Sequence, residues 1–182
     1  MRIIAVVVFM FSLCTVQIAG ADGEATDSEE LKALYDADQA VRSEESRKAG
    51  KYPTLQEERD RRFAVFQLIT EGKLHPANDY LHAGIVIHHT GSIASESGEQ
   101  VRLGTESKLL AFFLFKRAHQ LGHESGRPLM AAAYNYYLRA CGEDANKFGY
   151  KFDGREPIWR PSTEGDETEA LKCGFDPRRH FE

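Results

Sequence analysis

Three histidines lie within a largely apolar stretch, DYLHAGIVIHHTG, which runs from Asp79 to Gly91. An imidazole titrates near neutral pH, so it can transfer a proton or bind a metal ion. His82 and His89 are seven residues apart, which would place them on one face of a helix, about two turns apart. Asp79 precedes His82 by three residues and can reach its ring on a helix. This spacing would suit a His–Asp general acid–base pair, but histidines hydrogen-bonded at the edge of a helical core are the favoured interpretation.

A zinc site would require histidines from more than one helix. His119 and His123 have the four-residue spacing with which histidines bind zinc on a helix. Gly122 is expected to end that helix between them, which would separate the two rings. A zinc site would then need ligands from both helices, such as His82, His89 and His119. We therefore predict that the protein holds no metal and no other cofactor.

Polar residues on two other predicted helices extend this surface. Arg62 falls on the apolar face of its helix, where an arginine either reaches solvent or pairs with a buried acid. Asn135 and Arg139 flank another apolar face, and a solvated flank is the alternative for them. The sequence contains no G-x-S-x-G, G-x-G-x-x-G or P-loop motif. If the protein is an enzyme, these motifs do not identify its catalytic residues. The predicted ligand-binding groove contains His82, His89, Asp79, Arg62, Asn135 and Arg139.

Caps and hydrophobic periodicity predict five helices, over residues 28–47, 54–72, 76–91, 105–122 and 128–142. Thr54 and Glu57 in TLQE predict a capping box at the start of the second helix. The fourth helix contains LLAFFLF, which is apolar on all sides and is expected at the centre of the fold. The first helix has a thin apolar stripe and should be peripheral. The four-residue spacing of Asp38 and Arg42 in it predicts an ordinary surface ion pair.

The apolar residues also predict which face of a helix is buried. On the second helix this face contains Leu55, Phe66 and Ile69. On the third it contains Tyr80, Ala83, Val86 and Ile87. After Gly142, the stretch NKFGYKFDGREPIWRP predicts a hairpin or an extended cover, and DETEALKCGF predicts one short final helix.

These elements predict an all-α protein, a compact bundle of about five helices with an irregular C-terminal segment. Residues 111–138 resemble the helix–turn–helix pairs of TPR and Sel1 repeats, although one pair does not make a repeat array. We predict a single helical domain over residues 22–182, with a core over 28–142 and a C-terminal cover over 143–182.

The N-terminus has the layout of a secretory signal peptide. Arg2 precedes an apolar run from Ile3 to Val16, and small residues follow up to Ala21. Cleavage after Ala21 would leave 161 of the 182 residues in a secreted or periplasmic protein. The apolar run continues after Cys14, whereas a lipid-modified cysteine would end it, so a lipoprotein is the less favoured interpretation. The run is shorter than the roughly 20 residues of a membrane span, and we predict no stable membrane span.

The charge balance limits the kinds of partner. The chain has 23 Lys and Arg against 28 Asp and Glu, and loss of Arg2 would leave 22 against 28, a net charge of −6. A mildly acidic chain without a basic cluster argues against a nucleic-acid partner. An unknown protein or small molecule is therefore expected.

Two cysteines remain after the predicted cleavage, Cys141 and Cys173. In an oxidising compartment they could form a disulfide that ties the last core helix to the C-terminal tail. Such a bond would close a loop of about thirty residues and add about 3 kcal/mol of stability. Two unrelated buried thiols are the alternative.

Several stretches, in this order, resemble a bacterial family of uncharacterised helical proteins: DADQAVR at 36–42, DYLHAGIVIHHTG at 79–91, LGH at 121–123, LMAAAYNYYL at 129–138 and NKFG at 146–149. That family is marked by D-Q-x-x-R, D-Y-x-H-A and K-F-G motifs, and the resemblance extends over residues 31–177. The matching positions are Asp38, Gln39, Arg42, Asp79, His82, His89, His123, Lys147, Phe148 and Gly149.

The chain also departs from the family pattern. Asn135 stands where an acid is expected and Tyr136 where an arginine is expected. If that acid were catalytic in relatives, this chain would be impaired. Further departures are Thr90, Tyr150 and Lys151. The resemblance implies an all-helical core with a short C-terminal appendage, and it implies no activity.

Three functional interpretations follow from these patterns. The first is a binding or interaction module whose groove contains the histidines. The second is a hydrolase-type enzyme that uses His82 or His89 with Asp79, with or without a metal ion. The third is a purely structural protein of the cell envelope. We favour the first, because the sequence shows no complete catalytic set.

Overall fold

The computed structural model describes residues 26–89, 93–94, 100–101, 106–142, 150–153 and 156–159. The predicted all-α fold is confirmed for this part of the chain: five helices of 13 to 16 residues pack together with one short helix. The helices are α1 (Glu29–Val41), α2 (Glu44–Lys48), α3 (Leu55–Thr70), α4 (Ala77–His89), α5 (Glu106–Gln120) and α6 (Gly126–Ala140).

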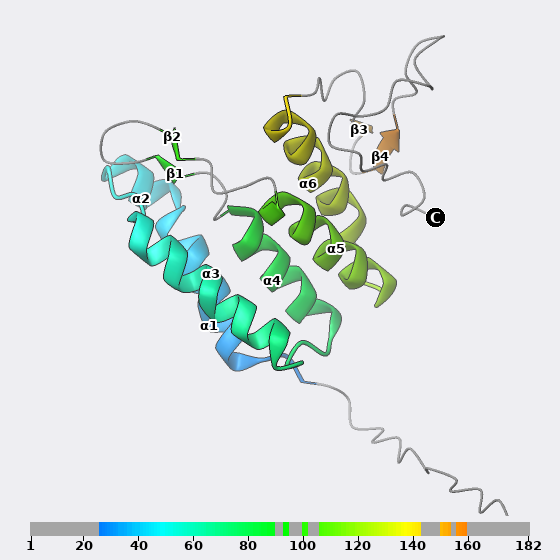
Figure 1. The fold of residues 1–182 in the computed structure, drawn as a ribbon, viewed down its shortest axis with the longest axis horizontal. Helices are drawn as coiled ribbons and strands as arrows, with labels where there is room; N and C mark the ends of the chain where they lie inside the picture. The colour runs from blue at the N-terminus through cyan, green and yellow to red at the C-terminus, as the bar shows by residue number, and fades with distance from the viewer. Residues whose placement is uncertain are drawn as a thin grey trace, which may run out of the picture.

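The long helices lie side by side (Figure 1). Helix α4 packs against α1 and α3 and also against α5, while α5 lies between α4 and α6. The apolar α5 is therefore central, as predicted, but it shares the central position with α4. Helices α5 and α6 pack against each other across the turn at 121–125. Their resemblance to repeat helices stays a prediction.

Two short antiparallel sheets accompany the helices. One pairs β1 (Ile93–Ala94) with β2 (Gln100–Val101). The other pairs β3 (Tyr150–Asp153) with β4 (Glu156–Trp159), with Tyr150 opposite Trp159. This second hairpin confirms the extended C-terminal element predicted from the glycines and aromatic residues. The predicted signal peptide at 1–21 and the predicted final helix in DETEALKCGF lie outside the described residues.

Local capping decides where the first three helices begin. The capping box at Thr54 and Glu57 is confirmed: the Glu57 carboxylate accepts from the Thr54 main-chain N–H at 2.7 Å. The single helix predicted over 28–47 is wrong, because the chain leaves the helical path after Val41. There the Ser43 side chain accepts from the Ser46 N–H at 3.1 Å and starts α2.

The core is built mainly from α4, α5 and α6. Its largest fully buried side chains include Tyr134, Phe112, Phe115 and Ile87. Gly84 allows α4 and α5 to approach closely, since a Cβ at this position would lie 2.5 Å from the Phe115 ring. The helix positions at 82 and 89 are thereby held at a fixed depth relative to α5.

The predicted buried faces are partly right. On α4, Ala83, Val86 and Ile87 are fully buried as predicted, while Tyr80 is only partly buried. On α3 the prediction is wrong for Leu55 and Phe66, which are each 37% exposed, whereas Ile69 is partly buried and packs against the core. The buried side chains of α3 are instead Glu58, Val65 and Leu68. Helix α3 is turned so that a carboxylate faces inward, and this acid has cationic partners described below.

Candidate functional site

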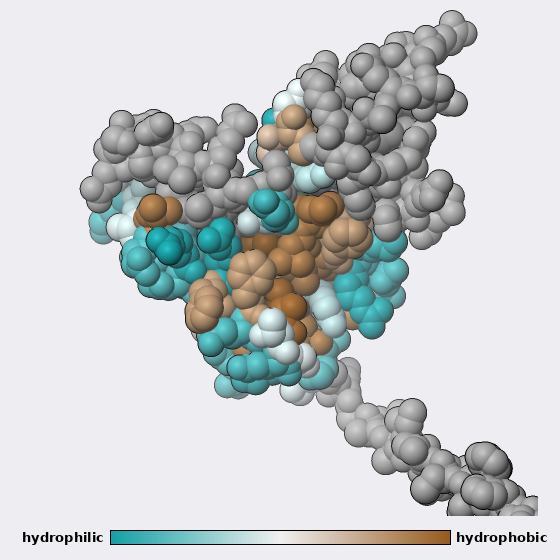
Figure 2. Space-filling view, viewed as in Figure 1, coloured by the Kyte–Doolittle hydropathy of each residue, from teal (hydrophilic) through white to brown (hydrophobic). Residues whose placement is uncertain are grey.

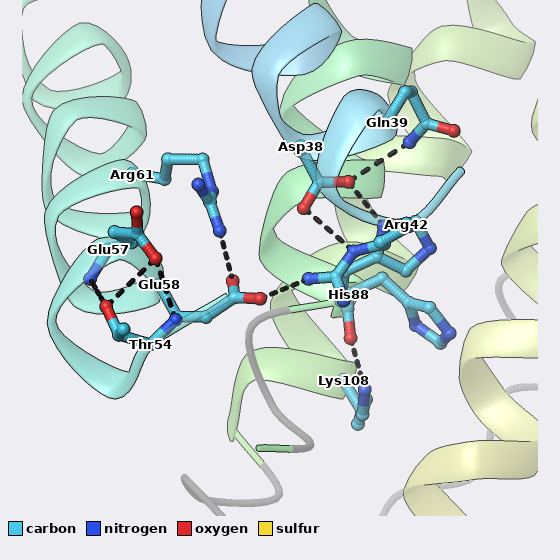
Figure 3. A network of polar contacts seen from close by, with 10 residues as sticks. Asp38, Gln39, Arg42, Thr54, Glu57, Glu58, Arg61, His88 and Lys108 are labelled. Atoms are coloured by element: carbon cyan, nitrogen blue, oxygen red, sulfur yellow. Dashed lines mark hydrogen bonds and ion pairs between the residues drawn. The ribbon is translucent and has the colours of Figure 1, made fainter. Parts of the chain in front are cut away.

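Charged and polar side chains from four helices meet where α1 packs against α3 and α4 (Figure 3). We call this group the polar junction. Its members lie on α1 and α3, on the last turn of α4 and on the first turn of α5. They are Asp38, Gln39, Arg42, Glu58, Arg61, His88, His89 and Lys108.

Asp38 is the centre of the polar junction and is fully buried. One carboxylate oxygen accepts from Arg42 Nε at 3.0 Å. The other accepts from Gln39 Nε2 at 3.0 Å and lies 2.6 Å from His89 Nδ1. The ordinary surface ion pair predicted for Asp38 and Arg42 is therefore wrong. Helix α1 turns this flank toward α3 and α4, and several hydrogen bonds offset the cost of burying the carboxylate.

Arg42 connects Asp38 to a second buried acid. Its Nη2 donates to Glu58 Oε1 at 2.5 Å, and Glu58 is 1% exposed. Arg61, one turn further along α3, brings its Nη2 to 3.4 Å from Glu58 Oε2. One guanidinium thus joins carboxylates from α1 and α3. The buried acid expected for an arginine of α3 does exist, but its partners are Arg42 and Arg61.

His89 is the histidine that acquires a carboxylate partner. Its side chain is 32% exposed, and its Nδ1 is occupied by the fully buried Asp38. The carboxylate fixes the orientation of the ring and leaves Nε2 as the nitrogen available for a proton or a ligand. A carboxylate-oriented imidazole of this kind can act as a general base or as a hydrogen-bonding group for a ligand.

Lys108 closes the polar junction from α5. Its Nζ donates to the main-chain carbonyl of His88 at the end of α4, and Lys108 as a whole is only 5% exposed. The Nζ atom also lies 5.5 Å from the centroid of the Tyr136 ring. Burial, and to a smaller extent the charge of Arg42, lowers the pKa of Lys108 to about 8.

His88 is a neutral aromatic side chain in this setting. Burial, followed by the nearby charge of Lys108, lowers the pKa of His88 to about 3. Its ring meets the Tyr136 ring edge-on at 5.0 Å between centroids. The buried Nδ1 atom has no hydrogen-bond partner. Arg139 lies over the same Tyr136 ring at 5.3 Å, so one of the predicted groove residues is at the edge of the polar junction.

The predicted pairing of His82 with Asp79 is wrong. Asp79 is buried and accepts from the main-chain N–H groups of Ser28 at 2.9 Å and His75 at 3.2 Å. His82 instead stacks on Tyr35 with ring centroids 4.2 Å apart, and its Nδ1 has no hydrogen-bond partner. Burial lowers the pKa of His82. Asp79 therefore connects the start of α1 to the start of α4.

His82 and His89 do share one face of α4, as the spacing predicts. That face packs against α1, with His82 against Tyr35 and His89 against Asp38. Helix α1 covers the surface where the sequence predicts an open groove. His89 remains 32% exposed beside Arg42, whose side chain is 26% exposed, and His82 is partly buried.

The other predicted groove residues lie elsewhere. Arg62 lines a hollow of about 350 Å³ on α3, together with Gln56, Arg59, Asp60, Phe63 and Phe66. Asn135 is partly buried on α6. The structure thus brings His89 into the polar junction and Arg139 to its edge. A ligand-binding role of the remaining residues stays a prediction.

His119 and His123, at the end of α5, do not form a zinc-binding pair on one helix. The helix ends at Gln120, and Gly122 adopts a positive φ of 93°, as expected for the residue after a helix end. His119 is exposed, and the His123 Nδ1 atom accepts from the Ser125 N–H at 3.1 Å. Within the described ranges, no three metal-ligating side chains gather at one point. None of the described helices is long and apolar enough to cross a membrane.

Cys141, the C-cap residue of α6, is disulfide-bonded. The chain has two other cysteines, Cys14 and Cys173, and both lie outside the described residues. The bond at Cys141 removes the alternative of an unrelated thiol at this position. Its predicted partner, Cys173, stays a prediction.

Sequence reasoning missed Glu58, Arg61, His88 and Lys108 as members of the site. One signal was present, since Asp38 interrupts the apolar stripe of α1 where a buried position is expected. A charged residue within such a stripe, four residues before an arginine, favours a buried ion pair. No comparable signal marks Lys108, which lies in the polar first turn of α5, just before the apolar LLAFFLF run.

Comparison with known proteins gives no relative: no family model, curated protein or solved structure matches the chain. The interpretation of the site therefore rests on its geometry.

Proposed function

We propose that the protein is a secreted or periplasmic binding module that recognises its ligand at the accessible edge of the polar junction. The observation that carries this proposal is the fixing of His89 and Arg42 by one fully buried carboxylate. Both side chains are held by Asp38, yet they are 32% and 26% exposed. Donors that are oriented before a ligand arrives lose little conformational entropy when it binds.

The surface composition supports a binding role. Figure 2 shows apolar surface gathered over the middle of the bundle, around α4 and α5, with polar surface on either side. Phe113 on α5 is 40% exposed and Tyr136 on α6 is 47% exposed. Exposed apolar patches of this kind often mark the places where a protein binds a partner.

Two features of the chain support the proposed compartment. The first 21 residues have the charge and apolar pattern of a signal peptide. A disulfide at Cys141 is expected in a secreted or periplasmic protein and is rare in the cytosol. The acidic charge balance supports a protein or small-molecule partner rather than a nucleic acid.

Comparative retention experiments test the binding role. The mature protein, its His89→Ala variant and its His119→Ala variant would be immobilised and exposed to the extracellular or periplasmic fraction of the producing cell. We expect a defined ligand or protein to be retained by the wild type and by His119→Ala, and to be lost with His89→Ala. His119 is the matched control because it is an exposed histidine away from the polar junction. Equal retention by all three proteins would contradict the proposed site.

A hydrolase-type enzyme is the second candidate, because the His89–Asp38 pair has the arrangement of a catalytic base and its orienting carboxylate. This replaces the predicted His82–Asp79 pair with a pair that the structure contains. Hydrolysis of a panel of chromogenic esters and phosphoesters would test it. Loss of turnover in His89→Ala and a shifted pH profile in Asp38→Asn would favour the enzyme. Turnover that is unchanged in His89→Ala would contradict it.

We also propose that the chain belongs to the uncharacterised bacterial helical family described above. Three residues of its D-Q-x-x-R motif, Asp38, Gln39 and Arg42, contact one another and are joined by the motif histidine His89. Motif residues that are 51 positions apart but in direct contact support a shared site. Relatives that keep all four residues together would support this proposal, and relatives that keep only two of them would contradict it.

A further inference from the structure

The burial of Lys108 needs an explanation beyond helix packing. A lysine whose ammonium group binds the last carbonyls of a helix usually remains exposed to water. Lys108 is instead 5% exposed, and its described contacts are the His88 carbonyl and the Tyr136 ring. Within the part of the chain that the structure describes, no carboxylate pairs with it. A buried ammonium group without an anion is energetically costly.

The two buried carboxylates nearby do not supply that anion. Asp38 already accepts from Arg42, Gln39 and His89. Glu58 is paired with Arg42 and Arg61. Arg42 and Arg61 balance these two acids, so Lys108 adds a positive charge that the neighbouring acids do not neutralise.

Hydrogen-bond donors are left over next to this charge. Arg42 uses Nε for Asp38 and Nη2 for Glu58, which leaves Nη1 without a described partner. The Lys108 ammonium has three N–H groups, and one of them is used for the His88 carbonyl. His89 uses Nδ1 for Asp38 and keeps Nε2.

We propose that the polar junction binds an oxyanion, a carboxylate or a phosphate, between Lys108 and Arg42, with His89 beside it. This inference rests on the proposed binding function and names the chemical class of its ligand. Arginine and lysine are the usual ligands for such groups, because their N–H donors meet the oxygens with opposite charge. The Tyr136 ring, with Lys108 and Arg139 against it, forms an apolar wall on which the rest of the ligand can lie.

Binding of an oxyanion should be linked to protonation of Lys108. The groups that act on Lys108 are Arg42 at the C-cap of α1, His88 on α4 and Tyr136 on α6. Burial and the charge of Arg42 lower the pKa of Lys108 to about 8 in the free protein. An anion at this place would stabilise the protonated amine, so affinity should fall as the pH rises from 7 to 9.

Calorimetric titration of the mature chain with inorganic phosphate and, separately, with acetate tests the proposal. We expect saturable binding of one anion per chain, about tenfold weaker in Lys108→Met because a charged hydrogen bond is lost. Lys73→Met is the matched control, since Lys73 is exposed and pairs with Glu71 at 2.8 Å. The anion that binds more tightly, phosphate or acetate, identifies the ligand group as a phosphate or a carboxylate. For acetate, whose charge is constant over this range, the loss of affinity from pH 7 to 9 should be absent in Lys108→Met.

Two further measurements keep the outcomes distinct. Lys108→Arg retains the charge and should retain part of the affinity, and circular dichroism checks that each variant is folded. Absence of binding for both anions, or equal binding by wild type and a folded Lys108→Met, overturns the oxyanion site. If neither anion binds while ligand retention still depends on His89, the oxyanion proposal fails and the binding function stands. If anion binding depends on Lys108 but nothing is retained by the immobilised protein, the oxyanion site stands and the proposed function fails.

Discussion

The two ends of α4 are joined to α1 by the same kind of residue in different ways. At the start of α4, the buried Asp79 accepts from the main-chain N–H groups of Ser28 and His75. At the end of α4, the buried Asp38 of α1 accepts from side chains, including Arg42 and His89. A carboxylate that binds main-chain groups can only hold the chain. A carboxylate that binds partly exposed, polar side chains also orients groups that can contact a ligand.

Removal of Asp38 should have the largest effect on this comparison. In Asp38→Ala, Arg42 and His89 lose their shared partner inside the bundle, and we expect a loss of about 3–5 kcal/mol of unfolding free energy. Urea denaturation followed by circular dichroism measures it. Asp36→Ala is the control, because Asp36 forms an exposed pair with Lys32 and should change stability little. A similar small loss in both variants would show that the polar junction is not coupled to folding.

Removal of Asp79 should destabilise the other end without affecting binding. Asp79→Ala leaves the N–H groups of Ser28 and His75 without their acceptor, and we expect a loss of about 2–3 kcal/mol. The same urea denaturation measures this loss. Phosphate or acetate binding by folded Asp79→Ala should equal that of the wild type. Reduced anion binding by this variant would mean that the two ends of α4 are not separate in function.

The middle of α4 should respond to added volume. Gly84→Ala would place a Cβ 2.5 Å from the Phe115 ring, and we expect a loss of about 1–3 kcal/mol as α4 and α5 are forced apart. Thermal unfolding measures the change. Because the expected loss comes from this one close contact, a second variant, Gly84→Ala with Phe115→Leu, should recover part of it. Full stability of Gly84→Ala would indicate that this close approach is not required.

The last effect should be on acid stability, and it should appear only below about pH 6.5. The pKa of His88 is lowered from 6.5 to about 3, so the unfolded chain binds a proton at a higher pH than the folded chain does. This contribution to stability is fully present above about pH 6.5 and is lost as the pH falls toward 3. His88→Phe should therefore lose less stability than the wild type between pH 6.5 and 4. Parallel curves of unfolding free energy against pH for the two proteins would contradict the lowered pKa of His88.

Sequence reasoning succeeded where the determinants are local. The Thr54–Glu57 capping box, the helix end at Gly122 and the shared face of His82 and His89 depend on residues three to seven positions apart. A periodic pattern contains this information directly.

It failed where distant segments had to be placed next to each other. Arg42 and Glu58 are 16 positions apart, and Lys108 lies 20 positions after His88. Helix α3 buries Glu58 against Arg42, and the apolar residues of α3 alone do not predict this inward-facing carboxylate. The spacing pairs Asp79 with His82, whereas the observed partners of Asp79 are main-chain groups, which have no signature in the sequence.

Through Arg42, the polar junction includes a residue at the corner between α1 and α2. Arg42 is the C-cap residue of α1, and the next residue, Ser43, is the N-cap residue of α2. A displacement of the Arg42 guanidinium by a bound molecule would therefore act at the break between two helices rather than inside a continuous helix. Amide hydrogen exchange at Ser46, whose N–H is held by Ser43, would serve as a remote reporter of occupancy.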